Sequence, residues 1–311
     1  MNHWDILRQS LRLTWRSKAL WVFGILLALT SGSGVSVPRG NFRYQAQTDL
    51  PPLPPAWPII LIGLLLFLLF VALVALIVRY VAEVGLYRLI DEEISYDRPA
   101  SVGRGFRLGW DRRTLRLLGI DLLIGIPLTL FAIAAILAAL SPLLLLGVKA
   151  TAVRLLAIGL AVGLGLVTIL VLAVIGAILG VWRQIVARAA VLDDRSWLDS
   201  LREGYHLCLR HLNDVALMAL IMWGVSIAWG VVLIPVVLAL GAVAFVAGFI
   251  PGWLLATITG VKWLGMAIGV PIGLIIFVVP MAVLQGIFLT FHAGVWTITY
   301  RELTPAPVEA D

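Results

Sequence analysis

Five runs of this sequence contain no Asp, Glu, Lys or Arg, and each is longer than the roughly 20 residues that a helix needs to cross a bilayer. The runs are 58–78, 122–148, 155–182, 215–261 and 263–300. Hydrophobic residues make up 61% of the chain and charged residues 13%, against about 45–50% and about 25% in globular domains. The sequence therefore excludes a soluble fold and predicts an all-α polytopic integral membrane protein.

Cysteine and charge usage narrow the function classes further. The single Cys208 excludes a disulfide within the chain, and one thiol falls short of the roughly four ligands of a structural zinc site. We expect no metal and no cofactor. The formal charge is +6, but the basic residues lie between apolar runs, where lipid headgroups are the natural partner and nucleic acid is not.

The beginning of the chain predicts a further span. Met1–Lys18 is basic and the following stretch, Ala19–Pro38, is uncharged, which indicates an uncleaved first membrane helix. The segment 32–56 is rich in Pro and predicts an extended extracytoplasmic loop. Six spans result if 215–261 holds one span and a loop that turns at Pro251-Gly252; residues 242–261 could also form a re-entrant segment or an extra span.

The distribution of Lys and Arg tests this topology. With six spans, 18 of these residues fall on one side, in 1–18, 79–116, 183–210 and 301, and 5 fall on the other, at Arg39, Arg43, Lys149, Arg154 and Lys262. Basic residues are retained in the cytoplasm. The asymmetry predicts a bacterial cytoplasmic membrane protein with both termini, including the tail 304–311, in the cytoplasm.

Three stretches that precede odd-numbered spans resemble one another. Leu11-Arg12-Leu13-Thr14-Trp15 matches Phe106-Arg107-Leu108-Gly109-Trp110 at an offset of 95 residues, and Ser101-x-x-x-Gly105-Phe106 matches Ser200-x-x-x-Gly204-Tyr205 at an offset of 99. We interpret 1–311 as one membrane domain of three helical-hairpin repeats, approximately 1–82, 98–187 and 196–303. The alternative is convergence on a common way of meeting the membrane interface.

Each repeat begins with a predicted interfacial amphipathic helix. Apolar residues recur at helical spacing, as Trp4, Leu7, Leu11 and Trp15 do in the first and Leu198, Leu201, Tyr205 and Leu209 in the third, with Arg on the opposite face. We expect these helices to engage anionic lipid, or partner membrane proteins. The candidate headgroup ligands are Arg12, Arg16, Arg104, Arg107, Arg112, Arg113, Arg116, Arg202 and Arg210. In the alternative, the apolar stripes pack on the protein's own helix ends.

The segments before two of these helices resemble a known group of proteins. Two segments, taken with the Ser-x-x-x-Gly motifs that follow them, resemble uncharacterised bacterial multi-pass proteins. They are Gly85-Leu86-Tyr87-Arg88-Leu89-Ile90-Asp91 and Ala187-Arg188-Ala189-Ala190-Val191-Leu192-Asp193. Those are similar to the membrane domain of glycerophosphodiester phosphodiesterases. The resemblance implies a helical membrane module without assigned activity and without the catalytic domain.

Residues that could carry chemistry are few. No hydrolase, nucleotide-binding or metalloprotease motif is present, so we expect no enzyme. The intramembrane polar candidates are Asp121, Asp214, Gln285 and His292, which could meet in the cytoplasmic half of a bundle and serve a transporter or permease. The simpler interpretation is that Asp121 reaches Arg116 or caps a broken helix. The pairs Gly159/Gly163 and Gly176/Gly180 favour close helix packing over a discontinuous transport helix.

Overall fold

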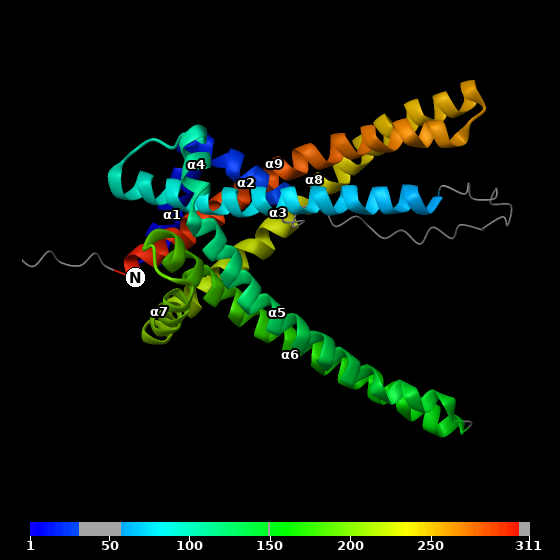
Figure 1. Cartoon of the computed structure of the whole chain (residues 1–311), viewed down its shortest axis with the longest axis horizontal. Helices are drawn as coiled ribbons and strands as arrows, with labels where there is room; N and C mark the ends of the chain where they lie inside the picture. Colours follow the sequence, from blue (N-terminus) through cyan, green and yellow to red (C-terminus); the bar gives the residue numbers. More distant parts are fainter. Residues whose placement is uncertain (31–56, 149, 305–311) are drawn as a thin grey trace, which may run out of the picture. The chain divides into compact units, whose positions relative to one another are not determined.

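The computed structural model describes residues 1–30, 57–148 and 150–304. Every element in these ranges is helical (Figure 1). In chain order they are α1 His3–Arg16, α2 Lys18–Thr30, α3 Trp57–Tyr96, α4 Val102–Gly109, α5 Arg112–Leu140, the 3-10 helix η1 Ser141–Gly147, α6 Thr151–Leu192, α7 Trp197–Arg210, α8 Leu212–Thr259 and α9 Lys262–Leu303. The predicted loop 32–56 and nearly all of the tail 304–311 lie outside the described residues.

Five of these helices are long and apolar enough to cross a membrane: those ending at Tyr96, Leu145, Leu192, Thr259 and Leu303. The chain is therefore a multi-pass membrane protein. The sixth expected span corresponds to α2, which is apolar but only 13 residues long in its described part. A sixth crossing thus stays a prediction.

The region around Pro251 differs from the sequence-based expectation. Residues 242–261 were expected to contain a loop turning at Pro251-Gly252, but α8 continues through both of its prolines to Thr259. The chain turns instead at Gly260, whose φ of +70° favours glycine. A proline inside a membrane helix removes one backbone hydrogen bond without ending the helix, because neighbouring groups compensate for it.

The chain divides into two compact units, and each is described by itself. One comprises Met1, Asp111–Ala219 and Thr299–Asp311, and the other comprises Asn2–Trp110 and Leu220–Ile298. In both, the core lies at the polar end of a long helix: Val84, Leu86 and Ile90 of α3 are fully buried, and so are Val186 and Ala190 of α6. The apolar lengths of the same helices are exposed, as expected of surfaces that lie in lipid.

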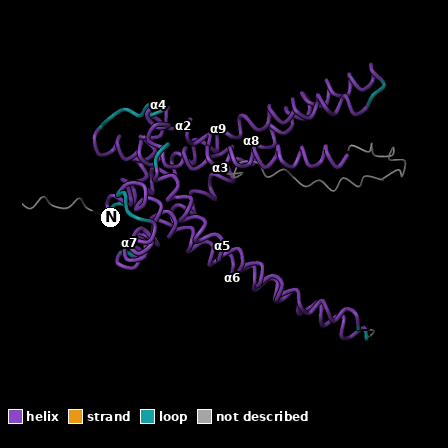
Figure 2. The backbone as a smooth tube through the Cα atoms, in the orientation of Figure 1, coloured by secondary structure: helices purple, strands orange, loops and turns teal. Residues whose placement is uncertain are grey.

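The short helices dock on long helices through small residues. A Cβ added to Gly109 of α4 would lie 2.2 Å from the carbonyl oxygen of Val81 in α3, and one added to Gly204 of α7 would lie 2.4 Å from Val186 in α6. In α1 the Ser10 hydroxyl donates to the carbonyl of Phe291 in α9 at 2.8 Å. Short loops join α3 to α4 and α6 to α7 (Figure 2).

Glycines on α6 do not pack as expected. A Cβ added to any of Gly159, Gly163, Gly176 or Gly180 would have no neighbour within 4 Å among the described residues. These four glycines therefore form no close-packing face with the described residues, and close packing at these positions stays a prediction. Glycines of α8 and α9 pack closely instead, as described below.

Candidate functional site

The apolar stripes of α1 and α4 are exposed. Trp4 is 79% exposed, Trp15 60% and Trp110 74%, whereas Ser10 and Thr14 on the docked face of α1 are almost fully buried. The docked face of α1 therefore consists of small polar side chains together with the fully buried Ile6, and the tryptophans are largely exposed. The stripes also contact α2: Trp15 lies against Trp21 and Phe106 against Phe23, with ring centroids 5.6 and 5.1 Å apart. Packing on the chain's own helix ends therefore stays an alternative.

In the other unit, α7 has the same division. Leu198, Tyr205 and Leu209 are exposed, and Ser200 and Gly204 are buried. Leu201 differs from the expected stripe, because it packs against the buried cluster of Ile120, Val186 and Ala190. Burial raises the pKa of the half-buried Cys208 thiol to about 11, so this thiol remains protonated near neutral pH.

The nine candidate headgroup arginines fall into two groups. Five are exposed and have no carboxylate partner among the described residues: Arg12, Arg107, Arg112, Arg202 and Arg210. The other four already have carboxylate partners: Arg16 lies 3.5 Å from Asp97, Arg104 3.4 Å from Glu92, and Arg113 and Arg116 lie 3.3 Å and 2.6 Å from Asp194. The exposed five are the better placed to meet a headgroup.

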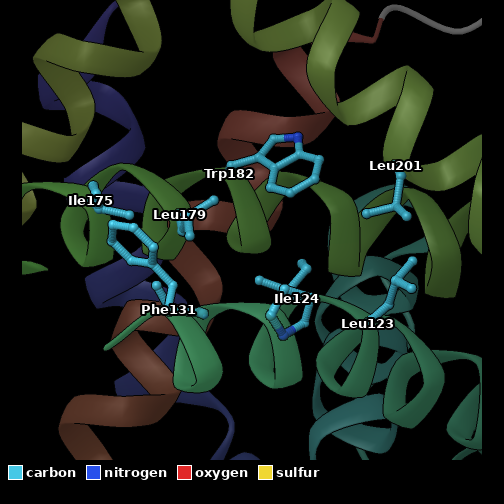
Figure 3. Close-up of a pocket in the computed structure, with 9 residues that line it drawn as sticks. Leu123, Ile124, Phe131, Ile175, Leu179, Trp182 and Leu201 are labelled. Carbon is cyan, nitrogen blue, oxygen red and sulfur yellow. The ribbon is translucent and has the colours of Figure 1, made fainter. Parts of the chain in front are cut away.

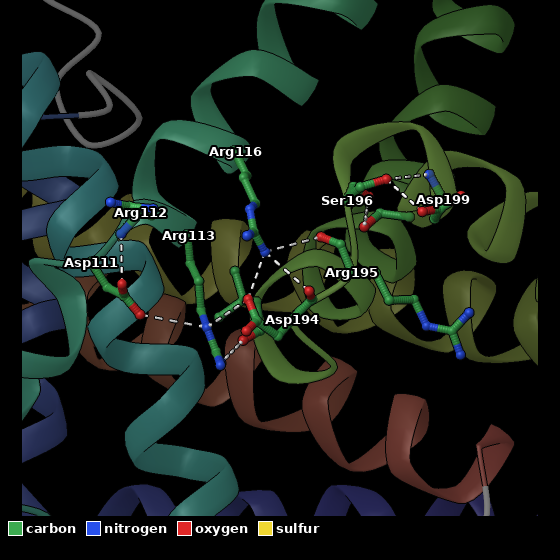
Figure 4. A network of polar contacts seen from close by, with 10 residues as sticks. Asp111, Arg112, Arg113, Arg116, Asp194, Arg195, Ser196 and Asp199 are labelled. Atoms are coloured by element: carbon green, nitrogen blue, oxygen red, sulfur yellow. Dashed lines mark hydrogen bonds and ion pairs between the residues drawn. The ribbon is translucent and has the colours of Figure 1, made fainter.

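Asp194 organises the turn between α6 and α7 (Figure 4). Its backbone is left-handed, with φ of +54°, and Asp97 takes the same conformation after α3, with φ of +46°. Arg116 donates to both the carboxylate and the carbonyl of Asp194, at 2.6 and 3.0 Å. The charge of the nearby Arg113 guanidinium is the main reason that the pKa of Asp194 lies below its ordinary value. A hydrogen bond from Arg116 lowers this pKa further.

Asp194→Asn is expected to lower stability near neutral pH by at most about 1 kcal/mol, because the ion pairs are largely solvent-exposed. Asn tolerates the left-handed backbone, so only the charge is removed. Because its pKa is lowered in the folded state, the carboxylate stabilises the fold at pH values above the ordinary Asp pKa of about 3.9. This stabilisation is lost as the pH falls through the lower pKa of the folded state. The difference in melting temperature between variant and wild type should vanish in strong acid.

Asp97→Asn is the matched control for this prediction, because Asp97 has the same backbone conformation but one long ion pair, with both partners highly exposed. Its melting shift should be smaller. A shift for Asp194→Asn that persists unchanged in acid would show that the effect is not electrostatic.

Asp121, the main intramembrane candidate, pairs with Arg183. Arg183 Nε and Nη2 donate to the two carboxylate oxygens of Asp121, each at 2.6 Å. The side chains are 14% and 23% exposed. This bidentate geometry is the strong form of an ion pair, and it compensates the carboxylate inside α5 with a charge from α6. Sequence reasoning named Arg116, Gln285 or His292 as partners and counted Arg183 only as a cytoplasmic charge.

The other polar candidates have separate surroundings. Asp214 lies in the first turn of α8, 3.9 Å from the amino terminus of the chain. His292 and Gln285 are half-buried on α9, and the His292 ring lies between Phe288 and Trp296, with centroids 6.3 and 6.4 Å away. Asp121 and Asp214 belong to one unit and Gln285 and His292 to the other. Their meeting in one place stays a prediction.

An apolar groove of about 420 Å³ lies beside the Asp121–Arg183 pair. Leu123, Ile124 and Phe131 of α5 face Ile175, Leu179 and Trp182 of α6 across it, and Leu201 of α7 lies at one end (Figure 3). Its lining lacks the convergent polar groups with which a protein orients a small-molecule substrate. The groove therefore shows no reaction chemistry.

Comparison with protein families places the chain. A family model described as a family of unknown function, DUF7544, matches residues 9–294. The chain belongs to this family. No curated protein and no solved structure matches it. An uncharacterised family agrees with what the sequence resemblance implied, while the likeness to the membrane domain of glycerophosphodiester phosphodiesterases stays a prediction.

Proposed function

We propose that this protein is a non-enzymatic module of the bacterial cytoplasmic membrane that binds anionic lipid through the outward faces of α1, α4 and α7. These faces lie at the cytoplasmic surface, with both chain termini on that side. The observation that carries the proposal is the exposure of Trp4, Trp15 and Trp110 together with the neighbouring arginines. Aromatic side chains and Arg on one exposed surface are the combination that holds a helix in the headgroup region.

The docking contacts support the proposed repeat. Each short helix presents small residues to a long helix: Ser10 in α1, Gly109 in α4 and Gly204 in α7. The same use of small residues leaves the same kind of surface outside in all three. A repeated amphipathic helix followed by two membrane helices is the simplest arrangement that accounts for this, and it multiplies the number of lipid contacts in one chain.

Transport is the alternative function, and the Asp121–Arg183 pair is the observation that bears on it. A carboxylate that carries protons must exchange its partner during the cycle, whereas this one is held by two short hydrogen bonds. We assign the pair to stability. Partner membrane proteins remain a second use of the same outward faces.

Replacing the exposed Arg12, Arg107 and Arg202 together with Glu is expected to reduce binding of anionic lipid by at least roughly tenfold, because each basic residue at an anionic surface contributes about 1 kcal/mol. Arg104, which pairs with Glu92, is left intact so that folding is not disturbed. The measurement is the ratio of phosphatidylglycerol to phosphatidylcholine retained by the purified protein after exposure to an equal mixture of the two.

A control with the same change of charge comes from the side predicted to be extracytoplasmic. Arg39, Arg43 and Arg154 are replaced together with Glu, and the lipid ratio should remain close to that of the wild type. Equal losses in the two triple variants would mean that overall charge, and not the faces of α1, α4 and α7, attracts the lipid. Subunits that co-purify with the wild type and leave the first variant would favour the partner-binding use.

A further inference from the structure

The helices α8 and α9 are much longer than a bilayer is thick. They contain 48 and 42 residues, which at about 1.5 Å per residue gives lengths of roughly 70 and 60 Å. The hydrocarbon core of a bilayer is about 30 Å thick. No Asp, Glu, Lys or Arg lies between Asp214 and Lys262. Most of the length of α8 therefore lacks any group that favours water.

Tilting alone does not place this length in lipid. Membrane helices tilt by up to about 40°, which accommodates about 26 residues in the hydrocarbon. Roughly 20 residues of α8 remain beyond that limit. Their side chains are exposed as well as apolar: Trp253 is 58% exposed and Ile258 72%. A pair of helices projecting into water would expose a large apolar surface on every side, which soluble surfaces avoid.

Close glycine contacts join the far ends of α8 and α9 into one body, here called the tip and defined as residues 242–273. A Cβ added to Gly252 would lie 2.7 Å from the carbonyl oxygen of Gly265, and one added to Gly248 would lie 2.6 Å from that of Gly269. The two helices run side by side to the turn at Gly260 (Figure 1). An apolar groove of about 810 Å³ runs along them, between residues such as Phe245 and Val270.

The register of the pair brings two prolines to one level. Trp229 stacks on Phe288 with centroids 5.3 Å apart, and Gly252 contacts Gly265 farther along the pair. Between these points, Pro235 of α8 is level with about residue 282, within one helical turn of Pro280 of α9. Each proline removes a backbone hydrogen bond from its helix. Pro235 follows Val215 by 20 residues, or about 30 Å, which is one hydrocarbon thickness.

We propose that α8 and α9 bend together at Pro235 and Pro280, and that the tip lies in the hydrocarbon of the leaflet opposite the basic helices, with acyl chains of that leaflet in its groove. The bend occurs where the pair has crossed the membrane once and where each helix has a proline at nearly the same level. Lipid is the occupant because the lining is apolar throughout, the groove is open along its length, and Lys262 at the turn is the one charged residue in the sequence of the tip. This contact is independent of the basic faces and needs no anionic lipid.

Nitroxide labels test the immersion directly. Phe245→Cys and Ile258→Cys, each in a Cys208→Ala background, are labelled and reconstituted in phosphatidylcholine vesicles, with the exposed Ser95→Cys as the control outside the membrane. Labels at the two tip positions are expected to be accessible to oxygen and protected from a water-soluble nickel chelate, and the control should show the opposite. Nickel accessibility at the tip would overturn the proposal. Protection from both reagents, with spin coupling between molecules, would also overturn it, because a second copy would then cover the groove.

The bend has its own test. The double variant Pro235→Ala and Pro280→Ala restores both hydrogen bonds and favours straight helices, so it should fold. The label at Ile258 should then move from the oxygen-accessible to the nickel-accessible class. Pro251→Ala, inside the tip, is the control and should leave the profile unchanged. An unchanged profile in the double variant would overturn the bend at these prolines.

Discussion

Asp121→Asn is expected to lower the free energy of unfolding by roughly 3 kcal/mol, because removing one partner of a largely buried ion pair leaves the other charge uncompensated. The charge left behind is that of Arg183, which is 23% exposed and makes two 2.6 Å hydrogen bonds to Asp121. Arg183→Gln should cost a similar amount. Reversible unfolding in mixed micelles, with helical circular dichroism as the signal, measures both.

The double variant Asp121→Asn with Arg183→Gln should recover most of this loss, because no buried charge is left unpaired. Arg154→Gln, an exposed change on the same helix α6, should alter stability little. If Asp121→Asn leaves stability unchanged, the ion pair has no structural role, and the transport alternative, in which this carboxylate exchanges partners, gains the support that it now lacks.

Gly24→Ala is expected to lower stability by more than about 2 kcal/mol, at the upper end of overpacking effects. The added Cβ would lie 2.1 Å from the carbonyl oxygen of Gly286 and 2.3 Å from the hydroxyl of Thr290. Because one neighbour is backbone, α2 must move away from α9, and rotation of a side chain cannot relieve the clash. Chemical unfolding in micelles and the yield of monodisperse protein measure the effect.

Gly119→Ala is the matched control, since the sequence repeat places Gly119 at the position of Gly24. A Cβ there would have no neighbour within 4 Å among the described residues. Replacing an open helical glycine with alanine should stabilise the helix by up to about 1 kcal/mol. Equal effects of the two substitutions would contradict the close approach of α2 to α9.

The sequence was sufficient to predict the helical class and the long apolar helices, because the absence of charge over 20 or more residues has one structural solution in a membrane. It was insufficient for the end of α8. Pro251-Gly252 has the composition of a turn in water, but inside an apolar helix a proline does not end the hydrogen-bonded ladder. The partner of Asp121 was missed for a different reason: Arg183 is 62 residues away, and only the packing of α5 along α6 brings the two together.

The faces of the short helices show how one pattern leaves two structures open. An apolar stripe opposite a row of arginines fits both a helix packed on protein and a helix lying on lipid. What distinguishes the two faces is the set of small residues: Ser10 and Thr14, spaced by four, and their counterparts Gly105 and Gly109. They form the docked face, which leaves the tryptophans outside. A similar signal, Gly265-x-x-x-Gly269-x-x-x-Gly273, marks the close packing of α9 that sequence reasoning assigned to α6.

Photo-crosslinking from position 15 tests the lipid-facing assignment of the short helices most directly. Trp15, which is 60% exposed, is replaced with a benzophenone amino acid. The protein is irradiated in native membranes, and the adducts are identified by mass spectrometry. The buried Thr14 serves as the control position. The account predicts phospholipid adducts at position 15 and crosslinks within the chain at position 14. Crosslinks from position 15 to another protein, without lipid adducts, would contradict it.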